Sequence, residues 1–205
     1  KNKSKTKPIW KPKDLESTIR ILPYRHGRDP FCILYFHYEL GKTKSALCAQ
    51  NFAKPCPICE FAESLRAEKT EESLEMFKQV ASKRRVYIPV VVRGKEKEGP
   101  KFCAISKGNY ELLIGYFMNP EYGDITHPTE GTDLVVEFSP PGQAGLKYGK
   151  SVIKPKRNKS LLSEDKATVI SLIKSVPNIF EVFTEQSYSE LKNILDDYLN
   201  PAEHT

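Results

Sequence analysis

Four residues between positions 37 and 59 have the chemistry and the spacing of a metal site. They are His37, Cys48, Cys56 and Cys59. Zn²⁺ prefers a tetrahedral set of imidazole nitrogen and thiolate sulfur, and a Cys-x₂-Cys pair lets two sulfurs converge from one tight turn. The spacing therefore predicts one zinc ion with four protein ligands. A buried pair of cysteines beside an unrelated histidine is the alternative interpretation.

A zinc ion with four protein ligands has no open position for water, so we expect it to be structural. Outside this cluster, Asp124 and His127 share a loop, but no nucleophile or second carboxylate accompanies them at a spacing typical of catalysis. We therefore expect a protein that is not an enzyme. A metal-dependent nuclease that uses Asp124 and His127 is a weaker alternative.

The charge of the chain is unevenly distributed. Its formal net charge is +6 at pH 7, but residues 161–205 carry eight acids and three bases, so residues 1–160 carry about +11. A basic body is typical of proteins that bind a polyanion. We expect a basic arm over residues 1–13, which has six lysines and no acid, and an acidic helical C-terminal segment over residues 161–205.

The two cysteines outside the cluster, Cys32 and Cys103, lie in apolar runs that are typical of strands. We expect both to be buried free thiols. The sequence shows neither a secretory leader nor an apolar run long enough to span a membrane. These features predict a reducing, intracellular setting and no membrane partner.

Alternating and β-branched segments predict a protein of the α+β class that is mainly β. Strands are expected over residues 17–24, 31–40, 45–48, 86–93, 101–106, 132–139 and 146–153. Helices are expected from residue 57, over 71–81, over 108–119, over 163–175 and over 185–199. Pro89 cannot donate a ladder hydrogen bond, so its strand should have an edge or a bulge there. Arg20 alternates with apolar residues and should point away from the core.

The order of these elements predicts how the chain is divided. Residues 14–160 should form the core, and the metal-binding segment, at about 37–82, should be inserted between its strands. The metal would then hold this inserted segment together.

Cations lie close in sequence to aromatic residues throughout the basic body. Proteins that bind single strands without sequence preference use this mixture, because cations track the backbone and exposed rings stack on bases at about 1–3 kcal/mol each. The rings are Tyr24, Tyr35, Tyr87, Phe102, Tyr110 and Tyr148, and the cations are Arg20, Arg25, Arg84, Arg85, Lys107, Lys147 and Lys150. Tyr35 and Tyr116 are better interpreted as core residues, whereas Tyr87 and Tyr148 favour base contact.

The order of these motifs is similar to that of a known family. The chain resembles the single-stranded-DNA-binding, helix-destabilising proteins of T-even-type bacteriophages, the gene-thirty-two protein family. The resemblance begins with Ile19-Arg20-Ile21-Leu22-Pro23, Asp29-Pro30-Phe31, His37, Cys48 and Cys56-Pro57-Ile58-Cys59. It continues through the Tyr87 strand, a charged glycine-containing hairpin, Phe102 and Glu130-Gly131, and covers about residues 10–160.

The resemblance implies an OB-fold core, a five-stranded Greek-key barrel, with an inserted zinc subdomain and peripheral helices. It implies one structural zinc ion on His37, Cys48, Cys56 and Cys59. Family members have a basic amino-terminal arm that binds a neighbouring protomer, and Lys3-Ser4-Lys5-Thr6-Lys7 is similar to it in composition. They also have an acidic tail that recruits replication and recombination proteins, but the helical segment after residue 160 is not equated with it.

Sequence and resemblance together predict a phage protein that acts in the cytoplasm of the infected bacterial host. It would bind single-stranded DNA with little sequence preference, protect it during replication, recombination and repair, and destabilise duplex. A zinc-ribbon module for RNA binding or transcription is the alternative. The residues expected to contact DNA, from the resemblance and from the pairing of rings with cations, are Arg20, Arg84, Arg85, Tyr87, Phe102, Lys107, Tyr110, Lys147 and Tyr148.

Overall fold

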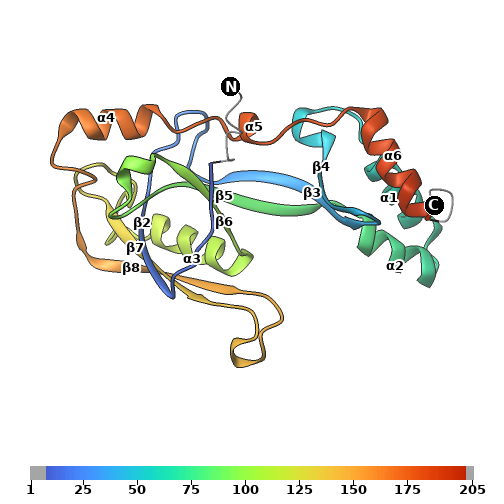
Figure 1. Cartoon of the computed structure of the whole chain (residues 1–205), viewed down its shortest axis with the longest axis horizontal. Coiled ribbons are helices and arrows are strands. Elements are labelled where there is room, and N and C mark those ends of the chain that lie inside the picture. Colours follow the sequence, from blue (N-terminus) through green and yellow to red (C-terminus); the bar gives the residue numbers. More distant parts are fainter. Residues whose placement is uncertain (1–7, 202–205) are drawn as a thin grey trace, which may run out of the picture. The chain divides into compact units, whose positions relative to one another are not determined.

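A computed structural model describes residues 8–201, which divide into two compact units (Figure 1). Unit 1 comprises residues 8–32 and 86–182, and unit 2 comprises residues 33–85 and 183–201. Unit 2 therefore contains the expected metal-binding insert with slightly wider bounds. We expected residues 161–205 to form one segment. Instead, residues up to Val182 belong to unit 1 and the following ones to unit 2. Lys1 to Lys7 of the expected arm lie outside the described residues.

Unit 1 is built on a sheet with the strand order β1-β6-β5-β2-β7-β8. Neighbouring strands are antiparallel, except that β1 is parallel to β6. The strands are β1 (Ile9–Trp10), β2 (Glu16–Ile21), β5 (Lys83–Val92), β6 (Lys101–Ile105), β7 (Thr132–Ser139) and β8 (Lys150–Lys159). The first three residues of β5 belong to unit 2. The α+β fold with mainly sheet structure is confirmed.

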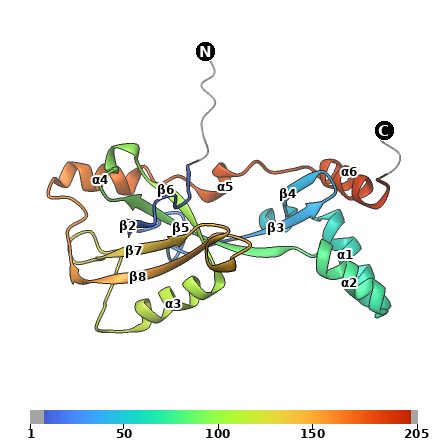
Figure 2. The same ribbon diagram turned by 60° about the horizontal axis from the view of Figure 1, so that its bottom comes forward.

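One helix covers the core face of this sheet. The core residues of β2, β5 and β7 include Ile19, Val90 and Leu134, and Leu113 of α3 (Lys107–Met118) packs among them. Asn109 ties α3 to β8, since its Nδ2 donates to the Ser151 carbonyl at 2.9 Å, and Figure 2 shows the helix beside this strand. Trp10 packs against the same core. Both Cys32 and Cys103 are buried free thiols, as expected.

Pro89 lies in the interior of the sheet, with neither an edge nor a bulge in its pairing with β6. It faces Phe102 in a continuous β5–β6 register. The Pro89 carbonyl points toward β2 and accepts from the Leu22 N–H at 2.9 Å, one residue beyond the end of β2. The expectation was wrong because the missing N–H of proline faces Leu22, one residue beyond the last residue of β2, so no hydrogen bond within β2 depends on it.

Two helices complete unit 1, α4 (Lys166–Lys174) and α5 (Ile179–Val182). The N-cap of α4 is Asp165, whose carboxylate accepts from the backbone of Ala167 and Thr168, so the helix starts later than expected. Two short 3₁₀ helices, η2 (Glu96–Glu98) and η3 (Gln143–Gly145), lie in hairpins. None of the helices within residues 8–201 is both long and apolar enough to cross a bilayer.

Unit 2 consists of one hairpin and helices around a small core. Its elements are β3 (Cys32–Leu40), β4 (Thr43–Leu47), the 3₁₀ helix η1 (Ala49–Phe52), α1 (Pro57–Glu68), α2 (Glu71–Val80) and α6 (Tyr188–Leu199). Leu191 and Leu195 of α6 are buried against Ile58 and Leu65 of α1. A capping box between Ser187 and Glu190 starts α6. The acidic C-terminal helix is therefore part of the unit that contains the candidate metal ligands.

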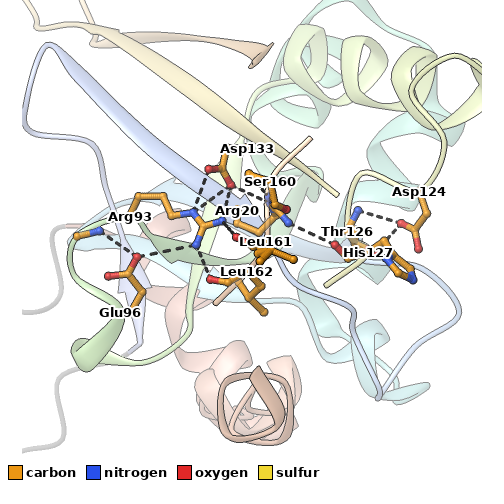
Figure 3. A network of polar contacts seen from close by, with 11 residues as sticks. Arg20, Arg93, Glu96, Asp124, Thr126, His127, Asp133, Ser160, Leu161 and Leu162 are labelled. Atoms are coloured by element: carbon orange, nitrogen blue, oxygen red, sulfur yellow. Dashed lines mark hydrogen bonds and ion pairs between the residues drawn. The ribbon is translucent and has the colours of Figure 1, made fainter. Parts of the chain in front are cut away.

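Arg20 is the largest buried polar residue of unit 1, which contradicts the expectation that it points outward. Its side chain is 0% exposed, and its Nε donates to the Asp133 carboxylate at 2.8 Å (Figure 3). The Arg20 side chain points to the face of β2 opposite to Ile19 and Ile21. That face is covered by the segments around His127 and Ser160, whose carbonyls accept from Arg20. Burial lowers the pKa of Arg20, whereas the Asp133 carboxylate acts to raise it.

A second arginine joins the same carboxylate. Arg93 donates to both oxygens of Asp133, at 2.8 to 3.1 Å, and to the carbonyls of Leu161 and Leu162. Gly131 has no room for a side chain, because a Cβ there would lie 2.3 Å from the His127 carbonyl oxygen. The network thus joins β2, β5, β7 and the chain after β8, four segments that are distant in sequence.

We expect Arg20→Met to destabilise unit 1 strongly. Removing one partner of a buried ion pair costs about 3–5 kcal/mol, and the loss should fall near the lower limit because Arg93 still neutralises Asp133. Urea unfolding measures the effect, and Arg25→Met, which removes an exposed cation, is the matched control. Unchanged stability with lowered DNA affinity would instead assign Arg20 to the DNA surface.

Candidate metal centre and candidate nucleic-acid interface

The four candidate ligands of unit 2 converge on one point. His37 comes from β3, Cys48 follows β4, Cys56 is the N-cap of α1, and Cys59 lies in its first turn. Their four ligand atoms all lie within 4.8 Å of one another. Pro57 can start the helix directly after Cys56 because its missing N–H would have no partner in the first turn.

The distances between these atoms fit a tetrahedral metal site. Sγ of Cys48 lies 3.5 Å from Sγ of Cys59, and Nε2 of His37 lies 3.5 Å from Sγ of Cys56 and 3.7 Å from Sγ of Cys59. Metal bonds of about 2.3 Å to sulfur and about 2.0 Å to nitrogen give tetrahedral edges of about 3.8 Å between sulfurs and about 3.5 Å between nitrogen and sulfur. The cluster could therefore hold one metal ion.

The imidazole of His37 is oriented by the end of α2. Its Nδ1 lies 2.7 Å from the Val80 carbonyl oxygen, which can only accept, so Nδ1 carries the proton and Nε2 is left as the ligand. His37, Cys48 and Cys56 are buried, and Cys59 is partly exposed. Such a backbone contact fixes the ring before any metal arrives.

The cluster holds protons that a metal ion must displace. Contacts with Cys48 and Cys59 lower the pKa of the Cys56 thiol against the effect of burial. Burial acts to lower the pKa of His37, but contacts with Cys48, Cys56 and the Val80 carbonyl raise it to about 9. Because thiolates and a neutral imidazole bind metal, affinity should fall as the pH falls.

Asn51 positions the chain around Cys48, and sequence reasoning missed this residue. Its Nδ2 donates to the carbonyls of Tyr35 and Cys48, both at 2.8 Å, and its Oδ1 accepts from the Tyr35 N–H at 2.9 Å. The side chain thus replaces a strand partner for β3 beside the ligand loop. No signal in the sequence marks an asparagine for this contact, which depends on the fold.

The loop residues Asp124 and His127 have local structural contacts. Asp124 accepts from the backbone and the hydroxyl of Thr126, and Nδ1 of His127 accepts from the N–H groups of Thr129 and Glu130. Within residues 8–201, no group of three or more potential ligands other than the His37 cluster is arranged to hold a metal ion. The described loop therefore gives no support to the nuclease alternative.

Three of the residues expected to contact DNA are buried in unit 1, and a fourth, Tyr110, is partly buried there. Arg20 and Phe102 are 0% exposed, Tyr87 is buried, and Tyr110 packs edge to face on Phe31 with ring centroids 5.1 Å apart. Arg20, Tyr87 and Phe102 lie on β2, β5 and β6 of the sheet, whereas Tyr110 lies on α3. Arg20 and Phe102 therefore expose no surface to a base or phosphate in this structure.

The other five expected residues are exposed but lie in different places. Arg84 and Arg85 precede the buried part of β5, and the Arg85 guanidinium lies 5.3 Å from the Tyr38 ring centroid and donates to its hydroxyl. Lys107 lies 3.7 Å from Glu111 at the start of α3.

Tyr35, expected in the core, is 42% exposed, whereas Tyr116 packs on the core of unit 1 as expected.

Lys147 and Tyr148 belong to the most basic surface element of unit 1. We define the basic hairpin as residues 138–159, the end of β7, the connecting loop and β8; Figure 1 shows its gold and orange tip beyond the sheet. Tyr148 is 72% exposed and the Lys147 ammonium lies 5.5 Å from its ring centroid. The residues expected to contact DNA did not include the exposed cations of β8, which are Lys150, Lys154, Lys156, Arg157 and Lys159, although Lys150 was counted among the cations near rings.

A sequence signal for this element was available. Residues 138–163 contain six cations and no acid. Only Lys154 of β8 has an acidic partner among the described contacts of this strand, Glu137 at 2.6 Å on β7. The hairpin thus presents a row of cations next to an exposed ring.

Comparison with known proteins gives a match to a family model. The family model described as gp32 DNA binding protein like matches residues 13–199. No curated protein matches the chain. The matched span includes the candidate metal ligands and the whole basic hairpin.

We expect Co²⁺, a spectroscopic probe of such centres, to bind with one ion per chain. Three thiolates and one imidazole in tetrahedral geometry should give intense visible and thiolate charge-transfer absorption, and Cys56→Ser should weaken the latter. Cys32→Ala, which removes a thiol outside the cluster, should leave the spectrum unchanged. A weak, octahedral-type spectrum, or one insensitive to Cys56→Ser, would contradict the site.

Proposed function

The chain belongs to the gp32 DNA binding protein like family, and from that premise we propose that it binds single-stranded DNA with little sequence preference. The family match over residues 13–199 is the observation that carries the proposal. The charge and exposure of the basic hairpin support it, because cations that track a phosphate backbone read no sequence.

The exposed ring of Tyr148 supports a preference for single strands. A ring that is 72% exposed and flanked by Lys147 can stack on an unpaired base while the cation lies near the adjacent phosphate. In a duplex, both faces of each base are already stacked. The same surface should therefore bind duplex mainly through phosphates, and more weakly.

We further propose that the ion at His37, Cys48, Cys56 and Cys59 is a structural Zn²⁺. Three thiolates and an imidazole suit Zn²⁺, and four protein donors leave no position for a reactive water. His37 and the three cysteines would then join β3, the end of β4 and the start of α1 into one folded piece. This role agrees with a binding protein rather than an enzyme.

In the same proposal the sheet of unit 1 is an OB-fold, and the protein acts on DNA inside the infected bacterial cell. Protein that binds the open strand more tightly than duplex shifts the equilibrium toward open DNA by mass action. Protection of single strands in phage replication, recombination and repair would follow. Contacts with neighbouring protomers and with phage replication and recombination proteins belong to this proposal too.

Competition binding tests the proposed ligand. We expect labelled oligothymidylate to bind more tightly than a hairpin duplex of equal nucleotide content, with an affinity that falls steeply as salt is raised. An oligouridylate competitor and several DNA sequences test the discrimination between DNA and RNA and the lack of sequence preference. Equal or tighter binding of duplex would contradict the proposal, and preference for RNA would favour the zinc-ribbon alternative.

We expect Tyr148→Ala to weaken single-strand binding by about 1–3 kcal/mol, the value of one base stacked on an aromatic ring. Tyr148→Phe should retain most of the affinity, because the ring remains. Thermal unfolding of both variants should match the original protein, since the side chain is 72% exposed. Equal affinities for Tyr148→Ala and the original protein would exclude Tyr148 from base contact.

A further inference from the structure

A groove of unit 1 lies at the end of β8 away from the hairpin loop. Its volume is about 280 Å³, and its lining includes Tyr122, Pro155, Lys156, Arg157, Lys159 and a single acid, Glu121. This volume is at the lower limit of the roughly 300–1,000 Å³ of typical ligand sites. The groove therefore suits a small unit such as one nucleotide of a longer chain.

A bulge in β8 supplies the cations of this groove. Three residues, 156–158, lie between Pro155 and Lys159 on β8, whereas Asp133 alone lies between their partners Leu134 and Thr132 on β7. A bulge releases side chains from the regular alternation of a strand and re-aims them. Here it gathers Lys156, Arg157 and Lys159 along one groove.

The buried arginine network fixes both strands of the bulge. Asp133, opposite the bulge, is held by Arg20 and Arg93. Ser160, directly after β8, accepts from Arg20 at 2.8 Å through its carbonyl and at 2.6 Å through its hydroxyl. Ser160 also donates its N–H to the Gly131 carbonyl at 3.0 Å. The backbone that carries the cations is thus preorganised.

Tyr122 gives the groove a rigid aromatic wall. Its ring packs on Tyr116, with centroids 4.9 Å apart, and both rings lie against the core of unit 1. A ring that is already held in place loses little conformational freedom when a base stacks on it. The groove therefore combines the two elements of single-strand recognition, cations for phosphate and a ring for a base.

We propose that this groove is a subsite for one nucleotide of the bound single strand, with Lys156 and Arg157 on a backbone phosphate and Tyr122 against the base. The inference rests on the proposed function. Because residues 138–163 contain no acid, the groove continues the row of cations of the basic hairpin. In this assignment Arg20 is a positioning residue, which acts on DNA through Asp133 and Ser160.

The salt dependence of oligothymidylate binding tests the two cations. Each neutralised phosphate contributes about 0.7 to the slope of log affinity against log salt for single strands, so Lys156→Gln with Arg157→Gln, which frees the one phosphate that they share, should reduce the slope by about 0.7. Lys166→Gln with Lys174→Gln on α4 removes the same charge from exposed positions of the same unit and should leave the slope unchanged.

Photocrosslinking of the full chain tests the ring. An oligothymidylate with 5-iododeoxyuridine, irradiated and mapped by mass spectrometry, should crosslink to Tyr122 as well as to Tyr148, and Tyr122→Phe should keep the crosslink. A slope equal to the original, or crosslinks confined to other residues, would overturn the subsite while the proposed function stands. Absence of oligothymidylate binding by the original protein would overturn both.

Discussion

Unit 1 depends on the ion pair between Arg20 and Asp133. A guanidinium that is 0% exposed is tolerated only with its charge neutralised and its N–H groups bonded, and here a carboxylate, two carbonyls and a hydroxyl meet that demand. The partners come from β7, from the loop before it and from the chain after β8. Folding of these segments is therefore coupled, and the basic hairpin is anchored at its base.

Unit 2 differs from unit 1 in the interactions that would stabilise it. Its core is small, and the candidate ligands lie on three short segments, which are β3, the residue after β4 and the start of α1. The attraction between a metal ion and three thiolates would therefore supply stability that apolar burial cannot. The acidic helix α6 covers part of this core and closes it with Leu191 and Leu195. An acidic surface thus belongs to unit 2, while the row of cations belongs to unit 1.

The parts predictable from sequence were those set by local rules. The spacing of His37, Cys48, Cys56 and Cys59 identified a cluster that the structure brings together, and β7 was expected with the bounds it has. Pro57 correctly marked the start of α1. In each case the chemistry or the periodicity lies within a few residues, where neighbours in sequence decide the result.

The errors came from contacts between distant residues. Arg20 alternates like an exposed residue, but segments more than a hundred positions away cover it. Phe102 and Tyr87 lie next to cations in sequence, yet the structure buries both side chains. β8 was expected to end at Ile153 because its last residues are polar, whereas pairing with β7 extends it to Lys159. Burial of a particular side chain follows from topology, which periodicity alone does not give.

The central claim is that this chain holds DNA in its single-stranded form, and duplex melting tests it most directly. The melting temperature of an alternating adenine–thymine duplex should fall as protein is added, and the fall should shrink as salt is raised, because weaker phosphate contacts reduce the binding free energy. An unchanged or raised melting temperature at low salt would contradict the account.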